Sequence, residues 1–197
     1  MIEKKKLRII NATNRVISRV GIAGTTMRKI ADEAGLSTGA LYHHYKSKEE
    51  ILYDAMDRSL SVSTRMAQET KQGKYNREEA IEQIGKDLKK RFNKIDENRI
   101  QFYLAQEAIL GNEEILRKFG DKYQSWIGHV EELLQRIYEK QPTRYNKALA
   151  SLLIGSIDGI VMQVLLRGNT VDIDDICEVY NQLLLEGIPA LLDQWTE

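Results

Sequence analysis

The stretch IADEAGLSTGALYHHY, residues 30–45, has the residue types of two short helices joined by a tight turn. Gly35 can adopt the left-handed backbone conformation that ends a helix, and the next residue, Leu36, can fill the space between the helices. Ser37 is a preferred N-cap for the second helix. The spacing therefore predicts a helix-turn-helix.

The second of these helices has one apolar face and one polar face. Leu41 and Tyr45 lie four residues apart and are expected to face inward. The chemistry available on the other face is hydroxyl, methyl, phenol and imidazole contact, which suits the edges of base pairs in a major groove. The residues expected to face outward are Thr38, Ala40, Tyr42, His43 and His44.

Charge is distributed unevenly along the chain. Residues 1–48 contain ten Lys or Arg and three acidic residues, whereas the remainder contains 19 basic and 26 acidic residues. The overall neutrality therefore conceals a basic head and an acidic body. This asymmetry favours phosphate binding by the head alone. The alternative is an ordinary helical hairpin in which Gly35 only ends a helix.

The string TTMRKIADEAGLSTGALYHHYKSKEEIL, residues 25–52, resembles the DNA-binding segment of the TetR family of transcriptional regulators. The resemblance implies a homodimer that binds a palindromic operator in double-stranded DNA and leaves it when a small-molecule effector binds. We expect the following residues to contact DNA: Thr25, Thr26, Arg28, Ser37, Thr38, Gly39, Ala40, Tyr42, His43, His44, Lys46 and Lys48.

The chain departs from the family pattern at Thr38, where a longer or basic side chain is frequent. Thr38 and Ala40 offer one hydroxyl and methyl contacts, so direct base contacts are expected to be few. We therefore expect part of the sequence preference to come from DNA shape.

The whole chain is expected to be all-α, because no useful length of sequence alternates apolar and polar residues as a strand does. We predict a helix-turn-helix domain over residues 1–47 and a helical ligand-binding and dimerisation domain over 48–197. The first helix is expected at 3–20, with Leu7, Ile10, Ile17 and Val20 inward. The other expected elements are a long fourth helix capped by Ser47 and Glu50, a loop at 71–77, and helices near 78–95, 99–110, 121–139, 143–166 and 174–192.

The composition favours a cytoplasmic protein without a membrane segment. The single cysteine, Cys177, excludes an internal disulfide and fits a reducing compartment. The most apolar window, 152–166, contains Asp158 and is shorter than the roughly 20 residues that span a membrane.

The last two predicted helices carry more apolar surface than one small bundle covers. Two copies can hide this surface by pairing these helices into an intermolecular four-helix bundle. The alternative is packing within one chain. The predicted dimerisation residues are Leu149, Leu152, Leu153, Gly155, Ser156, Gly159, Ile160, Tyr180, Leu184 and Ile188.

A ligand site for a small apolar or aromatic effector is predicted in the body. Asp158 lies in an apolar run, where a carboxylate needs a donor, solvent or a cationic ligand; an internal partner is the favoured reading. The predicted ligand-binding residues are Phe102, Tyr103, Gln106, Glu107, Trp126, His129, Asp158 and Met162.

Other classes of function have little support. Adjacent His43 and His44 point about 100° apart on a helix, which is unsuited to a metal pair. A nucleophile, base and orienting group do not occur together in any motif, so neither an enzyme nor a cofactor or metal site is expected. A DNA-binding adaptor or architectural protein without a small-molecule switch remains the alternative.

Overall fold

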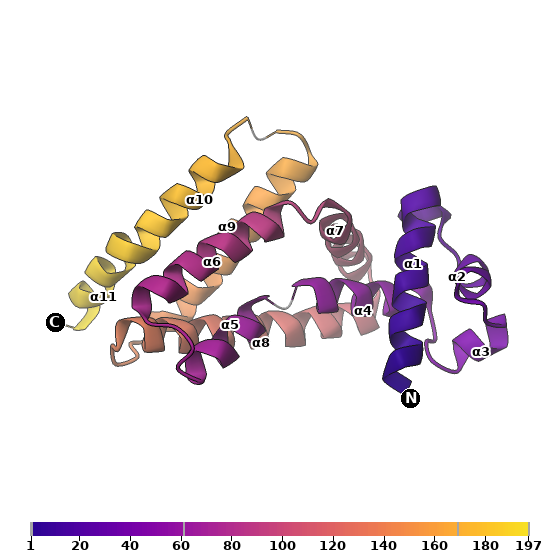
Figure 1. Cartoon of the computed structure of the whole chain (residues 1–197), viewed down its shortest axis with the longest axis horizontal. Helices are drawn as coiled ribbons and strands as arrows, with labels where there is room; N and C mark the ends of the chain where they lie inside the picture. The colour runs from indigo at the N-terminus through magenta and orange to yellow at the C-terminus, as the bar shows by residue number, and fades with distance from the viewer. Residues whose placement is uncertain (1, 61, 169, 197) are drawn as a thin grey trace. The chain divides into compact units, whose positions relative to one another are not determined.

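The computed structural model describes residues 2–60, 62–168 and 170–196, and within these ranges the regular structure is entirely helical (Figure 1). The predicted all-α class is confirmed. The elements are α1 (Ile2–Gly24), α2 (Met27–Ala34), α3 (Thr38–Tyr42), α4 (Lys48–Leu60), α5 (Val62–Lys71), α6 (Arg77–Phe92), α7 (Ile95–Ile109), α8 (Glu113–Tyr138), α9 (Asn146–Leu165), α10 (Ile173–Gln182), the π-helix η1 (Leu183–Gly187) and α11 (Ile188–Thr196).

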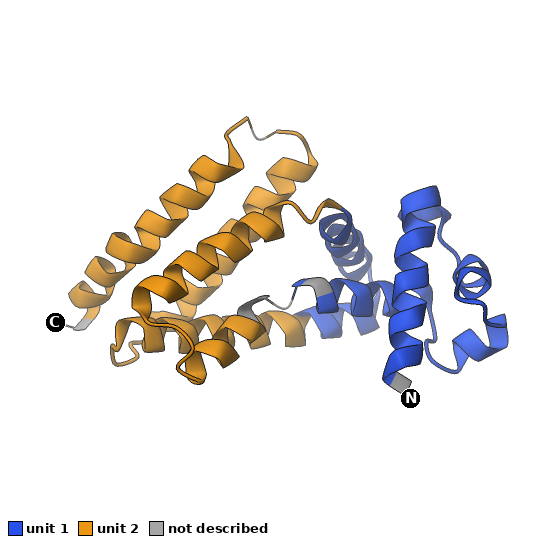
Figure 2. Ribbon diagram, in the orientation of Figure 1, with its two compact units in different colours: residues 1–60, 96–119 blue, residues 61–95, 120–197 orange. Residues whose placement is uncertain are grey.

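The chain divides into two compact units (Figure 2). Unit 1 consists of residues 1–60 and 96–119, and unit 2 of residues 61–95 and 120–197. Unit 1 therefore extends past the predicted boundary at residue 47 and takes in α7. The functional division at residue 47 stays a prediction, since α8 contributes residues to both units.

The core of unit 1 joins α1 to the two helices of the turn. Its buried cluster is completed by Met27 and Leu36, which pack against it. Two residues expected on the inner face of α1, Leu7 and Val20, are instead exposed, while Ile10 and Ile17 are buried as predicted. The buried face of α1 is therefore rotated about the helix axis relative to the predicted face. The residues of the cluster are Ile9, Ile30, Ala31, Leu41, Tyr45 and Ile51.

Several helix boundaries differ from the prediction. The fourth helix is described to Leu60 and α5 begins at Val62, and residue 61 between them lies outside the described residues. The helix predicted to begin at residue 121 begins at Glu113. The Asn112 side chain accepts a hydrogen bond from the Ile115 backbone N–H at 3.2 Å, which supports this earlier start.

The last helical segment contains a π-turn. Burial along α10, η1 and α11 falls on Tyr180, Leu184, Ile188 and Leu192, which are four residues apart. An ideal α-helix repeats every 3.6 residues, so wider turns at η1 help to keep this stripe on one face. Two side chains bind carbonyl groups of η1. The Tyr138 hydroxyl donates to the Leu184 carbonyl at 2.5 Å and Arg77 Nη2 donates to the Leu185 carbonyl at 3.1 Å.

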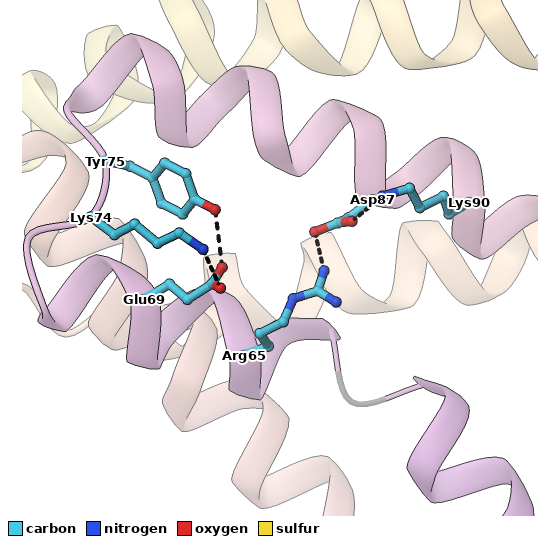
Figure 3. A network of polar contacts seen from close by, with 6 residues as sticks. All are labelled: Arg65, Glu69, Lys74, Tyr75, Asp87 and Lys90. Carbon is cyan, nitrogen blue, oxygen red and sulfur yellow. Dashed lines mark hydrogen bonds and ion pairs between the residues drawn. The ribbon is translucent and has the colours of Figure 1, made fainter.

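A polar network joins α5 to α6 in unit 2 (Figure 3). The Asp87 carboxylate is buried and receives Arg65 Nη2 at 2.5 Å and Lys90 Nζ at 3.4 Å. Burial by itself raises the pKa of Asp87, but the hydrogen bond from Arg65, together with those from Gln83 and Lys90, holds that pKa below its usual value. A second carboxylate, Glu69, accepts hydrogen bonds from Lys74 and Tyr75 in the loop that follows α5.

Helix α9 is apolar and largely uncovered within the protomer. By length and composition it is one helix that can cross a membrane, which corrects the expectation that the apolar window is too short. A helix that pairs with another chain passes the same test, so this property is weak evidence for a membrane span. The arrangement of its exposed residues is the more informative feature, and it is described below.

Replacing Asp87 with Asn tests the buried ion pair. We expect the free energy of unfolding at neutral pH to fall by about 2 kcal/mol, because a charge-assisted hydrogen bond is lost from a buried site. Since the folded pKa of Asp87 lies below its ordinary value of 3.8, its contribution is complete above that pH and is lost as the pH falls through the folded pKa. The difference between the two proteins should therefore shrink in acid.

Urea unfolding followed by tryptophan fluorescence measures this effect, since both tryptophans, Trp126 and Trp195, lie in unit 2. Glu82→Gln is the control, because Glu82 forms an exposed pair with Lys86 on the same helix. Equal unfolding free energies for the two variants would show that the Asp87 pair does not stabilise the unit.

Candidate functional site

The turn between α2 and α3 has the local geometry that its residues predict. Gly35 has φ 61° and ψ 43°, a left-handed conformation, and the Leu36 N–H donates to the Ala31 carbonyl at 2.9 Å. These features end α2 and redirect the chain. The Ser37 hydroxyl caps α3 by accepting the Ala40 N–H at 3.1 Å. Thr26, rather than Thr25, caps α2 by accepting the Lys29 N–H at 3.3 Å.

Most residues predicted to contact DNA are accessible. Tyr42 has 52% of its surface exposed, and Thr38, Ala40 and His44 are half-buried. Leu41, between them, is buried, so α3 presents one face to solvent. Thr25 is buried, and its hydroxyl donates to the Gly21 carbonyl at 2.7 Å, which is a structural role. The exposed members are Thr26, Arg28, Ser37, Gly39, Tyr42, His43 and Lys46.

Part of the positive charge of the head is neutralised locally. Arg15 Nε lies 2.6 Å from Glu33 Oε1, and Arg19 binds the other carboxylate oxygen. The hydrogen bonds from Arg15 and Arg19 hold the pKa of Glu33 below its usual value. Another cation, Lys6 Nζ, lies 3.7 Å from Asp54. The count of basic residues in the head therefore overstates the charge available to an external phosphate.

Lys48 differs from Lys46 in its surroundings. Only 18% of the Lys48 side chain is exposed, and its Nζ lies 5.2 Å from the centre of the Tyr103 ring and 3.8 Å from Glu49. The position is therefore packed within unit 1. Lys46 is exposed, in the link between α3 and α4. Lys46 is therefore the more accessible of the two lysines, and a phosphate contact by either of them stays a prediction.

The predicted ligand residues divide between the two units. Phe102, Tyr103, Gln106 and Glu107 lie on α7 in unit 1, whereas the other four lie in unit 2. In unit 2, His129 Nδ1 lies 3.2 Å from the Thr64 hydroxyl oxygen, while Met162 is exposed on α9. In the part of the chain that the structure describes, no group of three metal-binding side chains is found. Of the four predicted ligand residues in unit 2, Trp126 and Asp158 are the two that a chain of contacts connects.

A chain of polar and aromatic contacts links Asp158 to Trp126. The Tyr123 hydroxyl donates to Asp158 Oδ2 at 2.6 Å, and Arg91 Nη2 lies 3.6 Å from Asp158 Oδ1. The Tyr123 and Trp126 rings meet edge to face, with centres 5.3 Å apart. Asp158 thus has internal partners, which was the favoured prediction for this carboxylate.

Arg91 is the member of this cluster that the sequence reasoning missed. It occurs in the run KDLKKRF, residues 86–92, within the helix predicted near 78–95. Its position three residues after Leu88 and four after Asp87, both buried, was the available signal that it faces inward.

The predicted dimerisation residues fall into two groups. Leu149, Leu153, Tyr180, Leu184 and Ile188 are buried inside the protomer, so they are removed from the proposed contact surface. The Tyr180 hydroxyl, for example, donates to the Leu153 carbonyl at 3.0 Å. Of the others, Leu152, Gly155, Ser156 and Gly159 are exposed and Ile160 is half-buried.

The exposed apolar residues of α9, together with Leu166 directly after it, form one seam. Its members are separated by alternating steps of three and four residues, the spacing of a helix-pairing face. The ends of the seam are open to solvent, with Leu152 71% and Leu166 75% exposed. Val179 and Leu183 add exposed apolar surface in the segment that follows. The seam consists of Leu152, Gly155, Gly159, Met162 and Leu166.

Comparison with known proteins adds to this geometry. Residues 9–55 match the family model for bacterial regulatory proteins of the tetR family. The uncharacterized HTH-type transcriptional regulator YerO of Bacillus subtilis (strain 168) is 34% identical over 121 residues, which cover 59% of this chain and 40% of YerO.

Two solved structures share the fold over nearly the whole chain. A protein described as a TetR-family transcriptional regulator from Mesorhizobium loti has a TM-score of 0.73 and 18% identity, with 97% of this chain and 98% of that chain covered. Thermus thermophilus FadR, a TetR-family repressor in complex with lauroyl-CoA, has a TM-score of 0.67 and 18% identity, with 93% and 94% covered. At these identities the likeness shows the fold.

The fold and the turn define a helix-turn-helix protein with a helical body. Residues 9–55 match the TetR family of transcriptional regulators, and nearly the whole chain shares its fold with a TetR-family structure. The chain spans 40% or less of the lengths of the first curated relatives that it matches.

The two glycines of the turn region make a matched test of its geometry. Gly35→Ala should destabilise α2 and α3 by about 1–2 kcal/mol, since a side chain is strained in the left-handed conformation. Gly39→Ala should stabilise α3 by up to about 1 kcal/mol, because Gly39 lies in the helix and an added Cβ there meets no atom within 4 Å. Amide hydrogen exchange of α2 and α3 measures both effects. Equal protection in the two variants would contradict the assigned turn.

Proposed function

We propose that this protein is a DNA-binding transcriptional repressor that occupies a palindromic operator as a homodimer and leaves it when a small apolar effector binds. The observation that carries the proposal is the exposed face of α3, held by a capped turn in a segment that matches the TetR DNA-binding region. Relatives of this chain are named as transcriptional regulators, which supports regulation rather than catalysis. Such a regulator acts on DNA in the cytoplasm.

The proposed docking surface lies on α3 and the residues beside it. Thr38, Gly39 and Ala40 would face base edges, while Tyr42 and the two histidines would lie along the backbone or the rims of the bases. The exposed N-terminus of α2, with Thr26 as its cap, suits a phosphate, because the first backbone N–H groups of a helix point outward. Arg28 and Lys46 are exposed and supply positive charge nearby.

The proposed dimer forms along the α9 seam. Two glycines, Gly155 and Gly159, allow close approach of a second helix, and Leu152 and Leu166 would be covered by the partner. A symmetric pair of this kind presents two identical heads, as a palindrome requires. The seam also accounts for the apolar character of α9 without a membrane.

The proposed effector is an acyl compound bound in the helical body. Support comes from the fold shared with Thermus thermophilus FadR, which was solved with lauroyl-CoA. Unit 2 contributes an aromatic and polar cluster that suits such a ligand. A dimeric DNA-binding adaptor without a small-molecule switch is the alternative function, and operator binding that no ligand changes would favour it.

Two lysines test the docking surface. Lys46→Ala should weaken binding to duplex DNA for all sequences and reduce the salt dependence by about one ion, as expected when one phosphate contact is lost. Lys48→Ala should leave that slope unchanged, because Lys48 packs over Tyr103. Fluorescence anisotropy at several salt concentrations, with fragments selected from random duplex DNA, measures both. A reduced slope for Lys48→Ala alone would contradict the proposed surface.

The seam is tested by filling a glycine. Gly159→Leu should convert the dimer to monomers and weaken operator binding at least ten-fold, because the side chain holds the two helices apart. Gly128→Leu is the control, since Gly128 is an exposed glycine of α8 in the same unit. Sedimentation velocity measures the oligomeric state. A Gly159→Leu protein that sediments as a dimer would exclude this seam as the interface.

A further inference from the structure

The outer face of α6 carries charged side chains whose two signs are separated along the helix. The acidic residues occupy the first half of this face and the basic residues the second half. At 3.6 residues per turn their positions fall within an arc of about 120°. The structure describes α6 throughout, and none of its large apolar side chains is exposed. The exposed charged residues of this face are Glu78, Glu79, Glu82, Lys86, Lys89 and Lys90.

The needs of a single solvated helix do not account for this order. Acidic residues near the start and basic residues near the end of a helix suit its dipole. That effect falls off within the first and last turns, however, and Glu82 and Lys86 lie in the middle of α6. The order also places like charges four residues apart, as for Lys86 and Lys90, which destabilises an isolated helix. A partner with the opposite order of charge explains the arrangement better.

Two of the lysines have local ion pairs that leave them available to a partner. Lys86 Nζ lies 2.6 Å from Glu82 Oε1, but these side chains are 57% and 66% exposed, and such pairs contribute little to stability. Lys90 Nζ lies 3.4 Å from the Asp87 carboxylate, which Arg65 already binds at 2.5 Å. The Lys90 side chain is itself 67% exposed.

Two other members of the face have stronger local roles. Lys89 Nζ lies 2.5 Å from Asp174 of α10, and this hydrogen bond raises the pKa of Lys89, to which the charge of Asp172 adds. One carboxylate oxygen of Glu79 accepts the Asn76 N–H at 3.0 Å in the capping box of α6. The charge of Lys89 is therefore largely met within the protomer, whereas Glu79 keeps a second carboxylate oxygen for a partner.

The charge order of α6 is complementary to itself when a second copy of the helix runs antiparallel. A two-fold axis at the level of residue 84 relates the two helices, so each residue faces one that lies about as far from 84 in the other direction. Glu82 then faces Lys86 of the second copy, and Glu79 faces Lys90 of the second copy. Symmetry makes each of these contacts twice. The two helix dipoles also oppose each other in this arrangement.

A hollow on the basic half of the face has room for the opposing side chains. Its volume is about 590 Å³. Four of its five lining residues are lysines, so it suits carboxylates that enter from an opposing helix. The lining residues are Lys86, Lys89, Lys90, Asn93 and Lys94.

We propose that α6 is a second self-association surface, on which two copies of this chain pair antiparallel by matching acidic and basic halves. The surface is distinct from the α9 seam, and the inference does not depend on the proposed function. Because the contact lacks an apolar centre, it is weak and sensitive to salt. Such a contact acts when two copies are already held close together, as on neighbouring sites of one duplex.

Charge reversal with complementation tests the inference. Glu82→Lys makes the centre of the face basic and Lys86→Glu makes it acidic, so each variant repels its own copies. Each variant alone should associate about ten-fold more weakly than the wild type at low ionic strength, since two attractive contacts become repulsive. An equimolar mixture of the two variants should recover association to within about three-fold of the wild type, because the altered faces are opposite in sign.

Sedimentation equilibrium of the full chain over a concentration series measures this association. A second series at about 1 M salt, where the Debye length is about 3 Å, records the association that remains through apolar contacts such as the α9 seam. Glu132→Lys and Arg136→Glu are the matched controls, because they reverse an exposed pair four residues apart on α8 in the same unit. These variants, alone or mixed, should associate as the wild type does.

Two outcomes would overturn the inference. One is a wild-type chain whose association at low ionic strength is no stronger than at high salt. The other is a mixture of Glu82→Lys and Lys86→Glu that associates no more strongly than either variant alone. Urea unfolding of each variant shows that it is folded. Either outcome leaves the proposed operator binding and the α9 seam as they stand, because their own tests do not involve α6.

Discussion

The left-handed turn at Gly35 is the constraint on which the rest of the proposed interface depends. It ends α2 after two turns and places Leu36 against the cluster formed by α1, α2 and α3. Because Leu41 and Tyr45 are buried in that cluster, the opposite face of α3 is left exposed to solvent. One backbone conformation therefore determines which side chains are available to a partner.

Several charged residues of unit 1 pair with one another inside the unit. Glu33 holds Arg15 and Arg19, and Asp54 accepts a hydrogen bond from Tyr45 at 2.9 Å while lying near Lys6. These contacts orient α1 against the turn region. They also neutralise cations that a count of basic residues alone would treat as available to an external phosphate. Two cations that remain exposed are Arg28 on α2 and Lys46 shortly after α3, and both are candidates for contact with phosphates beside a major groove.

Unit 2 shows two different uses of polarity in a helical body. Asp87 is buried and satisfied by Arg65 of α5 and by Lys90 of its own helix, and its bond to Arg65 joins α5 to α6. In the cluster around Asp158, Lys122 Nζ also lies 5.6 Å from the centre of the Trp126 ring, and the Trp126 indole N–H is buried without an acceptor among the described residues. The first arrangement is complete within the chain. In the second arrangement the Trp126 indole N–H has no acceptor among the described residues. This difference separates a structural network from a candidate binding site.

Local signals in the sequence determined the helical class, the cap at Ser37, the turn at Gly35 and the inward positions of Leu41 and Tyr45. Each of these depends on a few neighbouring residues, so one sequence suffices. The tertiary structure decided which apolar residues of α9 remain exposed, that Lys48 packs over Tyr103, and that Arg91 turns inward to Asp158. These outcomes depend on partners far apart in the chain, because burial and ion pairing are set by the helices that pack together and not by spacing along one helix.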